Sequence, residues 1–317
     1  MPASRIFGLD FLRFVAVMLV VIGHGLALLP SFPGLYHFFR VFGFLGVEFF
    51  FVLSGFLIGT IFLKTFSETS GTKDLIYFWK RRWWRTLPNY YLFVLINFIG
   101  FSLLKEDFSF DWRYLFFLQN LTTPNEGFFS VSWSLTVEEW FYLSVPLVFL
   151  IAYRLTKSKA VAIWSTFIVI ICASMFGRYF YIANFEATWG DEMRRVALLR
   201  LDSLIYGVAA AWLWLNNREF LEKYKISLFL TGVCLLGLGI AIRNSPDINQ
   251  QTWMLLLLFP VISFGISCWL PLLSSWSFRG GRVRNLEAWV SSISLWSYSL
   301  YLALFRSVWK SRPLMIF

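Results

Sequence analysis

The chain has 317 residues, of which 58% are hydrophobic and 21% aromatic, whereas only 15% are charged. A soluble domain carries about 25% charged residues, so this composition excludes an ordinary soluble protein and predicts a polytopic protein of the lipid bilayer. The net charge of +10 falls largely in short loops, which indicates membrane orientation and no nucleic-acid partner. The cysteines are isolated in apolar segments without metal-ligand spacing, so we expect packing residues and no metal site: Cys172, Cys234 and Cys268.

Apolar segments follow one another along the whole chain, separated by charged and turn-forming residues. We predict an all-α fold, a polytopic transmembrane helical bundle of about nine or ten helices that forms one integral-membrane domain over residues 1–317. The first segment has no cleavage site after it, so it is predicted to remain as a helix and not to be a signal peptide. The predicted helices are 7–29, 41–63, 86–104, 133–153, 160–183, 198–215, 226–242, 253–273 and 286–305.

Positive charge is unevenly distributed between alternate loops. Fifteen Lys and Arg residues fall in loops 64–85, 154–159, 216–225 and 274–285, whereas six fall in loops 30–40, 105–132, 184–197 and 243–252. Cytoplasmic loops carry the excess of Lys and Arg, so we predict a cytoplasmic N-terminus. Nine helices would leave the C-terminus and its cations outside, against this rule. We therefore expect either a last helix beyond this chain or one re-entrant segment.

Three ionisable residues, Asp10, Arg13 and His24, interrupt the first apolar segment. Ionisable groups inside a membrane are costly and are commonly functional. Arg13 and His24 are separated by about three helical turns, so a helix places them on one face about 16 Å apart. We interpret them as a candidate functional pair. The alternative is that Arg13 reaches a lipid headgroup and His24 makes a structural hydrogen bond between helices.

The second apolar segment carries Glu48 about seven residues below its outer end, a depth that matches His24 in the first. If the two helices pack as a hairpin, the carboxylate could orient the imidazole. The alternative is that Glu48 pairs with another group or faces a water pocket. Ser54 and Gly55 follow in the same segment, and small residues in a membrane helix usually permit close helix contact, which we favour over ligand contact by Ser54.

A cation-rich stretch, FWKRRWWRTLP, runs from Phe78 to Pro88. Arg82 and Arg85 lie at i and i+3 on one helical face, and arginine forks suit phosphate oxygens. Together with Arg81 they predict a site for a polyanionic phosphate ligand at the inner face. The competing explanation is anionic-lipid binding and topology signalling, which such clusters also serve.

The stretch SWSLTVEEWFYL enters the fourth predicted helix. Ser134, Glu138 and Tyr142 fall at i, i+4 and i+8 and form one polar stripe. Glu138 could fix an arginine, accept a hydrogen bond from a sugar hydroxyl, act as a base or belong to a structural ion pair. Three further charged residues are interpreted mainly as counterions for Glu48 and Glu138, namely Arg178, Arg200 and Asp202.

Together these stretches resemble the integral-membrane acyltransferase family three. The matching motifs occur in one order: Arg13 to His24 (RxxxxxxxxxxH), Gly46 to Phe56 (GVEFFFVLSGF), Arg81 to Pro88 (RRWWRTLP), Ser134 to Leu143 (SLTVEEWFYL) and, more weakly, Arg200 to Gly207 (RLDSLIYG). The correspondence covers roughly the first two-thirds of the chain. Each motif alone is loose, whereas their order and spacing are fairly specific.

The resemblance implies a bundle of about ten helices in the plasma membrane, the inner membrane in a Gram-negative cell. It implies transfer of an acyl group, commonly acetyl, from cytoplasmic acyl-CoA to a hydroxyl of a carbohydrate or glycolipid acceptor on the outer side. By this likeness His24 would be the catalytic base or acyl relay, with Arg13, Glu48 and Glu138 as its companions. The donor would bind Arg81, Arg82, Arg85 and Arg13, and the acceptor would contact Ser134, Tyr142 and Arg200.

The C-terminal region departs from the family pattern. Ser297 to Leu302 match its SYSLYL run, but Leu304 stands where a histidine would fall and the chain stops soon after, so we expect a shortened C-terminus.

The main alternative function is a secondary transporter or flippase for a glycolipid, although no second pair of broken helices mirrors the first half. A second alternative enzyme class is the separate membrane-bound O-acyltransferase family. Its pattern would require a histidine in a late helix, whereas the histidines of this chain, His24 and His37, are both near its start. A non-catalytic scaffold is the remaining alternative.

Overall fold

The computed structural model describes residues 6–25, 33–66, 71–104, 108–124 and 127–276, and within them the chain forms helices and no strand. The all-α prediction is therefore confirmed. The long helices are α1 (Phe7–Gly25), α2 (Pro33–Thr65), α3 (Thr72–Leu104), α4 (Trp133–Thr156), α5 (Lys159–Asn184), α6 (Asp202–Asn216), α7 (Arg218–Arg243) and α8 (Thr252–Ser267). The shorter ones are η2 (Trp112–Phe116), η3 (Ser130–Ser132), η4 (Trp189–Met193), η5 (Ala197–Leu199) and α9 (Leu270–Ser275).

Six helical spans in the described part of the chain are long and apolar enough to cross a membrane, as in a multi-pass membrane protein. They are Arg40–Thr65, Thr72–Leu103, Ser130–Thr156, Lys159–Asn184, Arg218–Arg243 and Thr252–Ser275. Fewer spans are found than the nine or ten predicted. One reason is that α6 has 15 residues and is shorter than a bilayer-crossing helix requires. The predicted helix 286–305 lies outside the described residues.

Several helix boundaries differ from the predicted ones. The cation-rich stretch, predicted as a loop, forms the first half of α3, because the Gly71 backbone N–H bonds the Asp74 carboxylate at 3.0 Å and caps this helix at Thr72. Lys, Arg and Trp are also tolerated in a helix near a membrane surface, where long side chains extend to water. The predicted helix 253–273 is divided into α8 and α9, and Pro271 stands in the first turn of α9, a position that suits proline.

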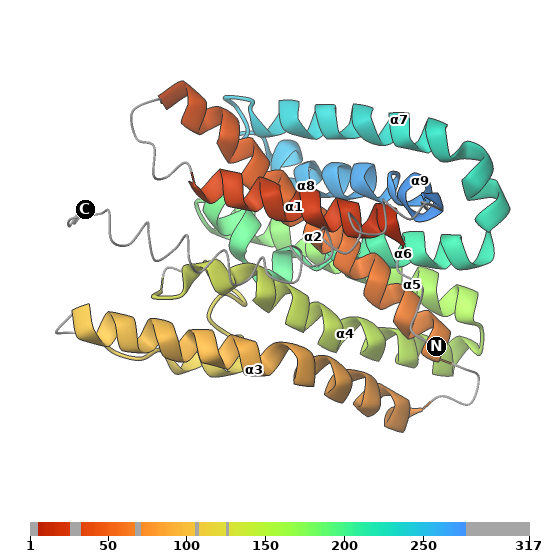
Figure 1. Cartoon of the computed structure of the whole chain (residues 1–317), viewed down its shortest axis with the longest axis horizontal. Coiled ribbons are helices and arrows are strands. Elements are labelled where there is room, and N and C mark those ends of the chain that lie inside the picture. Colours follow the sequence, from red (N-terminus) through yellow and green to blue (C-terminus); the bar gives the residue numbers. More distant parts are fainter. Residues whose placement is uncertain (1–5, 26–32, 67–70, 105–107, 125–126, 277–317) are drawn as a thin grey trace, which may run out of the picture.

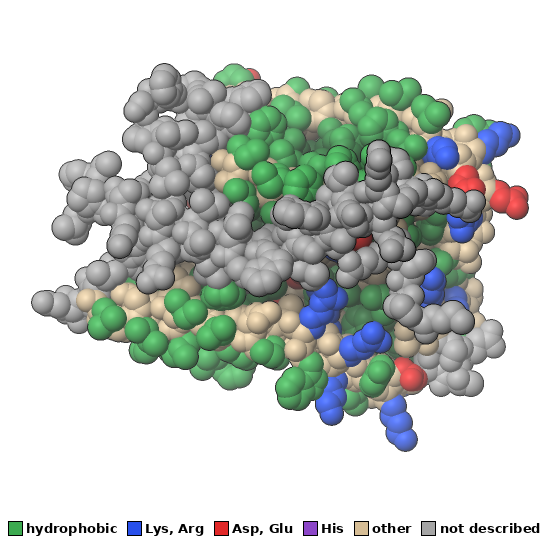
Figure 2. All heavy atoms as spheres, viewed as in Figure 1, with side chains coloured by type: hydrophobic (Ala, Val, Ile, Leu, Met, Phe, Trp, Pro, Cys, Tyr) green, Lys and Arg blue, Asp and Glu red, His purple; other side chains and the backbone are tan. Residues whose placement is uncertain are grey.

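The helices lie roughly parallel to the long axis of the bundle, with α7 and α8 along one side, α3 along the other, and α1 and α2 between them (Figure 1). The end of α2, the start of α3 and the α4–α5 and α6–α7 connections lie at one end. These are segments predicted to be cytoplasmic. On the face shown in Figure 2, Lys and Arg side chains gather at this same end, over the first half of α3, whereas hydrophobic side chains cover much of the rest of the described surface.

The centre of the bundle depends on close contacts between helix backbones. A side chain at Gly55 of α2 would place its Cβ 1.9 Å from the Leu204 carbonyl oxygen, and one at Gly207 of α6 would place its Cβ 2.1 Å from the Val52 carbonyl oxygen. Only glycine fits at these crossing points. The prediction that small residues in the second apolar segment permit close helix contact is therefore confirmed for Gly55.

Helix α3 lies at the edge of the bundle. In its most apolar window 17% of the residues are buried, compared with 56% for α2. Its second half is fixed to the η2 region, where the Tyr90 hydroxyl donates to the Tyr114 carbonyl and the Tyr91 hydroxyl to the Leu115 carbonyl, both at 2.8 Å. Its first half is fixed to α4, at the site described next.

Candidate active site

Three helices meet at a polar network in which Glu138 of α4 is the central acceptor. The Ser54 hydroxyl of α2 donates to Glu138 Oε1 at 2.9 Å, and the Tyr142 hydroxyl donates to Glu138 Oε2 at 3.1 Å. Arg82 Nη2 of α3 donates to the Tyr142 hydroxyl at 2.7 Å and lies 3.5 Å from Glu138 Oε2. Arg82 and Glu138 are 16% and 17% exposed, so this ion pair is only weakly screened by solvent. The network sets a cation beside a carboxylate that hydroxyl groups hold in place.

The local sequence explains how α4 presents this network. Glu138 and Tyr142 are one helical turn apart, so they share a face, as their spacing predicts. Ser134, one turn earlier, is half-buried and forms no contact with them among the contacts found in the described residues. Tyr142 also accepts from α3 through its backbone, because Trp79 Nε1 donates to its carbonyl oxygen at 2.8 Å. Ser54 is thus a hydrogen-bond donor to Glu138, a contact between helices that its position in the apolar segment does not indicate.

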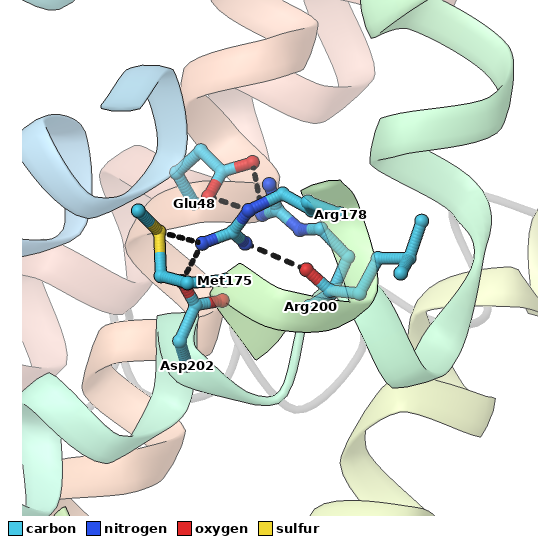
Figure 3. Close-up of polar contacts among 6 residues, drawn as sticks. Glu48, Met175, Arg178, Arg200 and Asp202 are labelled. Carbon is cyan, nitrogen blue, oxygen red and sulfur yellow. Dashed lines mark hydrogen bonds and ion pairs between the residues drawn. The ribbon is translucent and has the colours of Figure 1, made fainter. Parts of the chain in front are cut away.

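A second charged cluster lies in the core between α2, α5 and α6. Arg200 Nη2 donates to both Glu48 oxygens, at 2.7 and 2.6 Å, and Arg178 Nη2 donates to Asp202 Oδ2 at 2.6 Å. Arg178 also donates to the Leu199 carbonyl oxygen at 2.7 Å. Figure 3 shows the two ion pairs close together. All four charged side chains are 0% exposed, so each charge depends on its partner for stability.

The predicted counterion role of these residues is confirmed in part. Arg200 pairs with Glu48 as predicted. Arg178 pairs with Asp202 instead of with Glu48 or Glu138, because both belong to the α5–α6 corner, where η5 brings them together. The carboxylate of Glu138 is paired with Arg82 of α3.

Helix α1 is unbroken from Phe7 to Gly25 and so contains both Arg13 and His24. Arg13 Nη1 binds Asp10 Oδ1 at 2.9 Å, one turn earlier. The side chain of His24 lies outside the described part of the structure. Its predicted contact with Glu48 therefore stays a prediction.

The α1–α2 hairpin has a register that bears on this contact. A Cβ at Gly43 would lie 3.2 Å from the Gly23 Cα, and a Cβ at Gly46 would lie 2.8 Å from a Val20 methyl. Glu48 is thus five residues, or about 7.5 Å along the helix, beyond the residue opposite Gly23. The prediction that Glu48 and His24 lie at the same depth is therefore wrong, because the two helices pack in a different register, and a contact between them requires both side chains to extend along the helices. Extending the same register places Leu53 and Ser54 opposite the level of Arg13.

The predicted donor-binding arginines divide into two groups. Arg82 turns inward to α4, whereas Arg81 and Arg85 are exposed on α3. The different burial follows from position on the helix, because only one side of α3 faces the bundle. Arg81 and Arg85 are thus the members of this cluster that solvent or a ligand reaches from outside.

Comparison with known proteins identifies the family. A family model described as an acyltransferase domain matches residues 6–310. The chain belongs to this acyltransferase family. The resemblance to the integral-membrane acyltransferase family three is thereby confirmed, and the networks around Glu138 and Glu48 contain residues of the second to fifth motifs that carried it.

Named relatives are known from Staphylococcus aureus. The O-acetyltransferase OatA of strain NCTC 8325 is 29% identical over 283 residues, which cover 81% of this chain and 43% of that protein. A second protein, from strain COL, is named as a proposed O-acetyltransferase and is 32% identical over 232 residues, 65% of this chain and 34% of its own length. The chain thus spans less than half the length of these relatives. No solved structure matches the chain significantly.

The remaining polar residues include no metal site among the described residues and two arginines that share one aromatic neighbour. Within the described residues no group of three His, Cys, Asp or Glu side chains is placed to hold a metal ion. Two arginines that the sequence indicates only as loop charges are Arg194, between η4 and η5, and Arg243, at the end of α7. Both lie against the ring of Phe44, an arrangement that no sequence spacing indicates.

Proposed function

We propose that this protein is a membrane O-acetyltransferase. It transfers an acyl group, acetyl by analogy with the O-acetyltransferases it resembles, from cytoplasmic acyl-CoA to a hydroxyl of a carbohydrate or glycolipid on the outer side. The observation that carries the proposal is the Ser54–Glu138–Tyr142–Arg82 network in a chain of the acyltransferase family. It joins residues of three separate family motifs at one point in the bundle.

The donor is proposed to bind at the cation-rich end of α3. Arg81 and Arg85 are exposed there, and guanidinium groups bind phosphate oxygens in bidentate geometry. Arg82 is held by Glu138 and Tyr142 and so defines the inner limit of this cationic surface. Arg13 belongs to the same proposed donor path, because the α1–α2 register sets it at the level of Ser54. This depth supports a role between the coenzyme phosphates and the reacting carbonyl.

The acceptor hydroxyl is proposed to meet His24 near the outer end of α1. An alcohol at neutral pH requires a general base, and an imidazole supplies typically about 10²- to 10⁴-fold. Glu48 is proposed to orient this imidazole. The carboxylate is already held by Arg200. Because a carboxylate offers about four lone-pair sites, capacity remains for one further N–H donor. Acceptor contacts are assigned to Ser134, Tyr142 and Arg200.

Thiol release tests the proposal. The purified protein, in nanodiscs, is given acetyl-CoA and a mixture of lipid-linked and free saccharides from the producing cell envelope, and free coenzyme A is followed with a thiol reagent. His24→Ala is expected to lower the acceptor-dependent rate at least about 100-fold, the contribution of a general base. His37→Ala is the matched control, because His37 is the other histidine of the chain, and it should retain the wild-type rate.

Two outcomes would contradict the proposal, and a labelling experiment distinguishes its two possible mechanisms. Equal rates for His24→Ala and wild type would remove His24 as the base. Radiolabelled acetyl-CoA distinguishes direct transfer from a relay, because protein-bound label that His24→Ala abolishes supports an acetyl-histidine intermediate. Binding of a glycolipid without any acetyl-CoA binding would favour the transporter or flippase instead.

A further inference from the structure

Two arginines lie on one aromatic ring near the end of the bundle that carries His24. The guanidinium carbon of Arg194 is 5.3 Å from the ring centre of Phe44, and that of Arg243 is 5.4 Å from the same centre. Phe44 is 1% exposed and also packs edge-on against Trp189, which Arg243 covers at 4.7 Å. Arg194 in turn lies 5.1 Å from the ring of Trp133. Aromatic faces thus hold both cations in place.

Neither cation is matched by a carboxylate within the described residues. The ion pairs found there do not include Arg194 or Arg243. Arg194 Nη2 donates to the Gly43 carbonyl at 3.4 Å, and Arg243 Nη1 donates to Asn244 Oδ1 at 2.6 Å. The Nε–H groups of both arginines are buried and have no hydrogen-bond acceptor in the described structure. Buried guanidinium N–H groups without an acceptor are costly, and an oxyanion would satisfy them.

The surroundings add positive charge. Arg194 is near Arg195, Arg200 and Arg243, whereas the carboxylate near it, Glu48, is already bound by Arg200. Burial, together with repulsion from these three guanidinium groups, lowers the pKa of Arg194 to about 10. The cluster therefore has an excess of cations in a region of low solvent exposure, where attraction to an anion is strong.

The position of the cluster connects it to the proposed chemistry. The Gly43 carbonyl accepts from Arg194, and Gly43 packs on Gly23, the residue that precedes His24. An anion on Arg194 and Arg243 would thus be bound close to the α1 segment that holds the proposed base. Arg81 and Arg85, proposed to bind the donor, belong to the opposite half of the bundle, on the first half of α3 (Figure 1).

We propose that Arg194 and Arg243 bind an oxyanion of the acceptor, a carboxylate or phosphate carried by the carbohydrate or glycolipid. This inference rests on the proposed function and narrows its acceptor to an acidic molecule. The anion fixes the acceptor by charge-assisted hydrogen bonds at one point, and the hydroxyl to be acylated then lies toward the end of α1. A neutral saccharide lacks this anchor.

Binding to the full chain tests the inference without any acyl-CoA or turnover. The protein is placed in nanodiscs of phosphatidylcholine, binding of glucuronate and glucose is followed by saturation-transfer NMR, and binding of inorganic phosphate is followed by its displacement of glucuronate. Phosphate and glucuronate are expected to bind saturably and to compete, whereas glucose is not. Arg194→Gln and Arg243→Gln should each weaken phosphate binding at least tenfold. The matched control is Arg113→Gln, which removes an exposed arginine paired with Asp111, and it should bind as wild type does.

The lysine variants are controls that distinguish loss of the anion site from loss of the fold. Arg194→Lys and Arg243→Lys keep the charge and should bind phosphate within about fivefold of wild type. Gln variants that bind as tightly as the Lys variants overturn the inference, as does absence of saturable phosphate and glucuronate binding by wild type. Phosphatidylglycerol nanodiscs separate the sources of the anion, because displacement of glucuronate by this lipid would identify a lipid headgroup site and overturn the acceptor assignment. Failure of thiol release with intact anion binding would instead refute the proposed acetyl transfer alone.

Discussion

Removal of Arg200 should destabilise the fold strongly, because it would leave Glu48 buried without a counterion. Both side chains are 0% exposed, and one nitrogen, Arg200 Nη2, lies 2.6 to 2.7 Å from both Glu48 oxygens. Removing one partner of such a pair costs about 3–5 kcal/mol. The guanidinium also lies 3.5 Å from the ring centre of Phe259, which contributes about 0.5–2 kcal/mol more. Arg200→Ala is therefore expected to cost about 3.5–7 kcal/mol.

The same reasoning orders the other variants of this pair. Glu48→Gln leaves the buried Arg200 charge without a counterion, so it should cost about 3–5 kcal/mol, toward the lower end because the amide oxygen still accepts a hydrogen bond from Arg200. A double variant, Glu48→Leu with Arg200→Met, removes both charges and fills the space with apolar groups. Replacing a buried ion pair in this way is often neutral or stabilising, so the double variant should be more stable than Arg200→Ala by several kcal/mol, on the order of 3.

Equilibrium unfolding in mixed micelles of increasing SDS content measures these differences in the free energy of unfolding. The matched control is Arg218→Ala, which breaks the exposed i,i+4 pair with Glu222 and should cost about 0.5 kcal/mol or less. An Arg200→Ala variant within about 1 kcal/mol of wild type would refute the reasoning, since that is the scale of an exposed pair. So would a double variant whose loss of stability equals the sum of the losses of Glu48→Leu alone and Arg200→Met alone, because coupled residues are not additive.

Three further predictions follow from the other contacts. Gly55→Ala should destabilise the protein by about 1–3 kcal/mol in the same assay, because its Cβ would lie 1.9 Å from a carbonyl oxygen of α6. The control is Gly237→Ala, whose Cβ would have no atom within 4 Å, and it should be neutral or stabilising by up to about 1 kcal/mol. Equal effects of the two would contradict the contact. Tyr142→Phe removes the hydroxyl between α3 and α4 and should lower acetyl transfer at least about tenfold, a loss of about 1.4 kcal/mol, while an unchanged rate would show that the network is not needed. Arg85→Gln should raise the KM for acetyl-CoA about tenfold at constant kcat. The control, Lys73→Gln at the start of the same helix, should leave KM unchanged, and a change in kcat alone for Arg85→Gln would argue against donor binding.

The fold class and most helix positions follow from the sequence because apolar runs between charged clusters are a strong signal in a membrane protein. Boundaries failed where amphipathic residues continue a helix beyond the apolar run, as in α3, which begins at Thr72. Hydropathy detects transfer to lipid, whereas the helix itself depends on backbone hydrogen bonds and on a cap such as Asp74. The division of α8 from α9 was likewise invisible to hydropathy.

The candidate site was predictable within a helix and less so between helices. The spacing of Glu138 and Tyr142 specifies a shared face, and Arg200 was foreseen as a counterion of Glu48. Sequence spacing does not specify which helices are neighbours. The hydrogen bond from Ser54 to Glu138 and the ion pair between Arg178 and Asp202 therefore could not be predicted without the packing of the helices. The arginines around Phe44 come from α7 and the η4–η5 connection, and only the tertiary fold brings them to one ring.

Tyr142 has a consequence for how the bundle can move. Trp79 binds its backbone carbonyl and Arg82 binds its hydroxyl, so two consecutive turns of α3 are attached to α4 through a single residue. The position of α3 relative to α4 is thus coupled to the arrangement of charged side chains around Glu138. A displacement of the first half of α3 is expected to change the hydrogen-bond and ion-pair partners of Glu138, so spectroscopic labels that follow this helix would also report on the charges around Glu138.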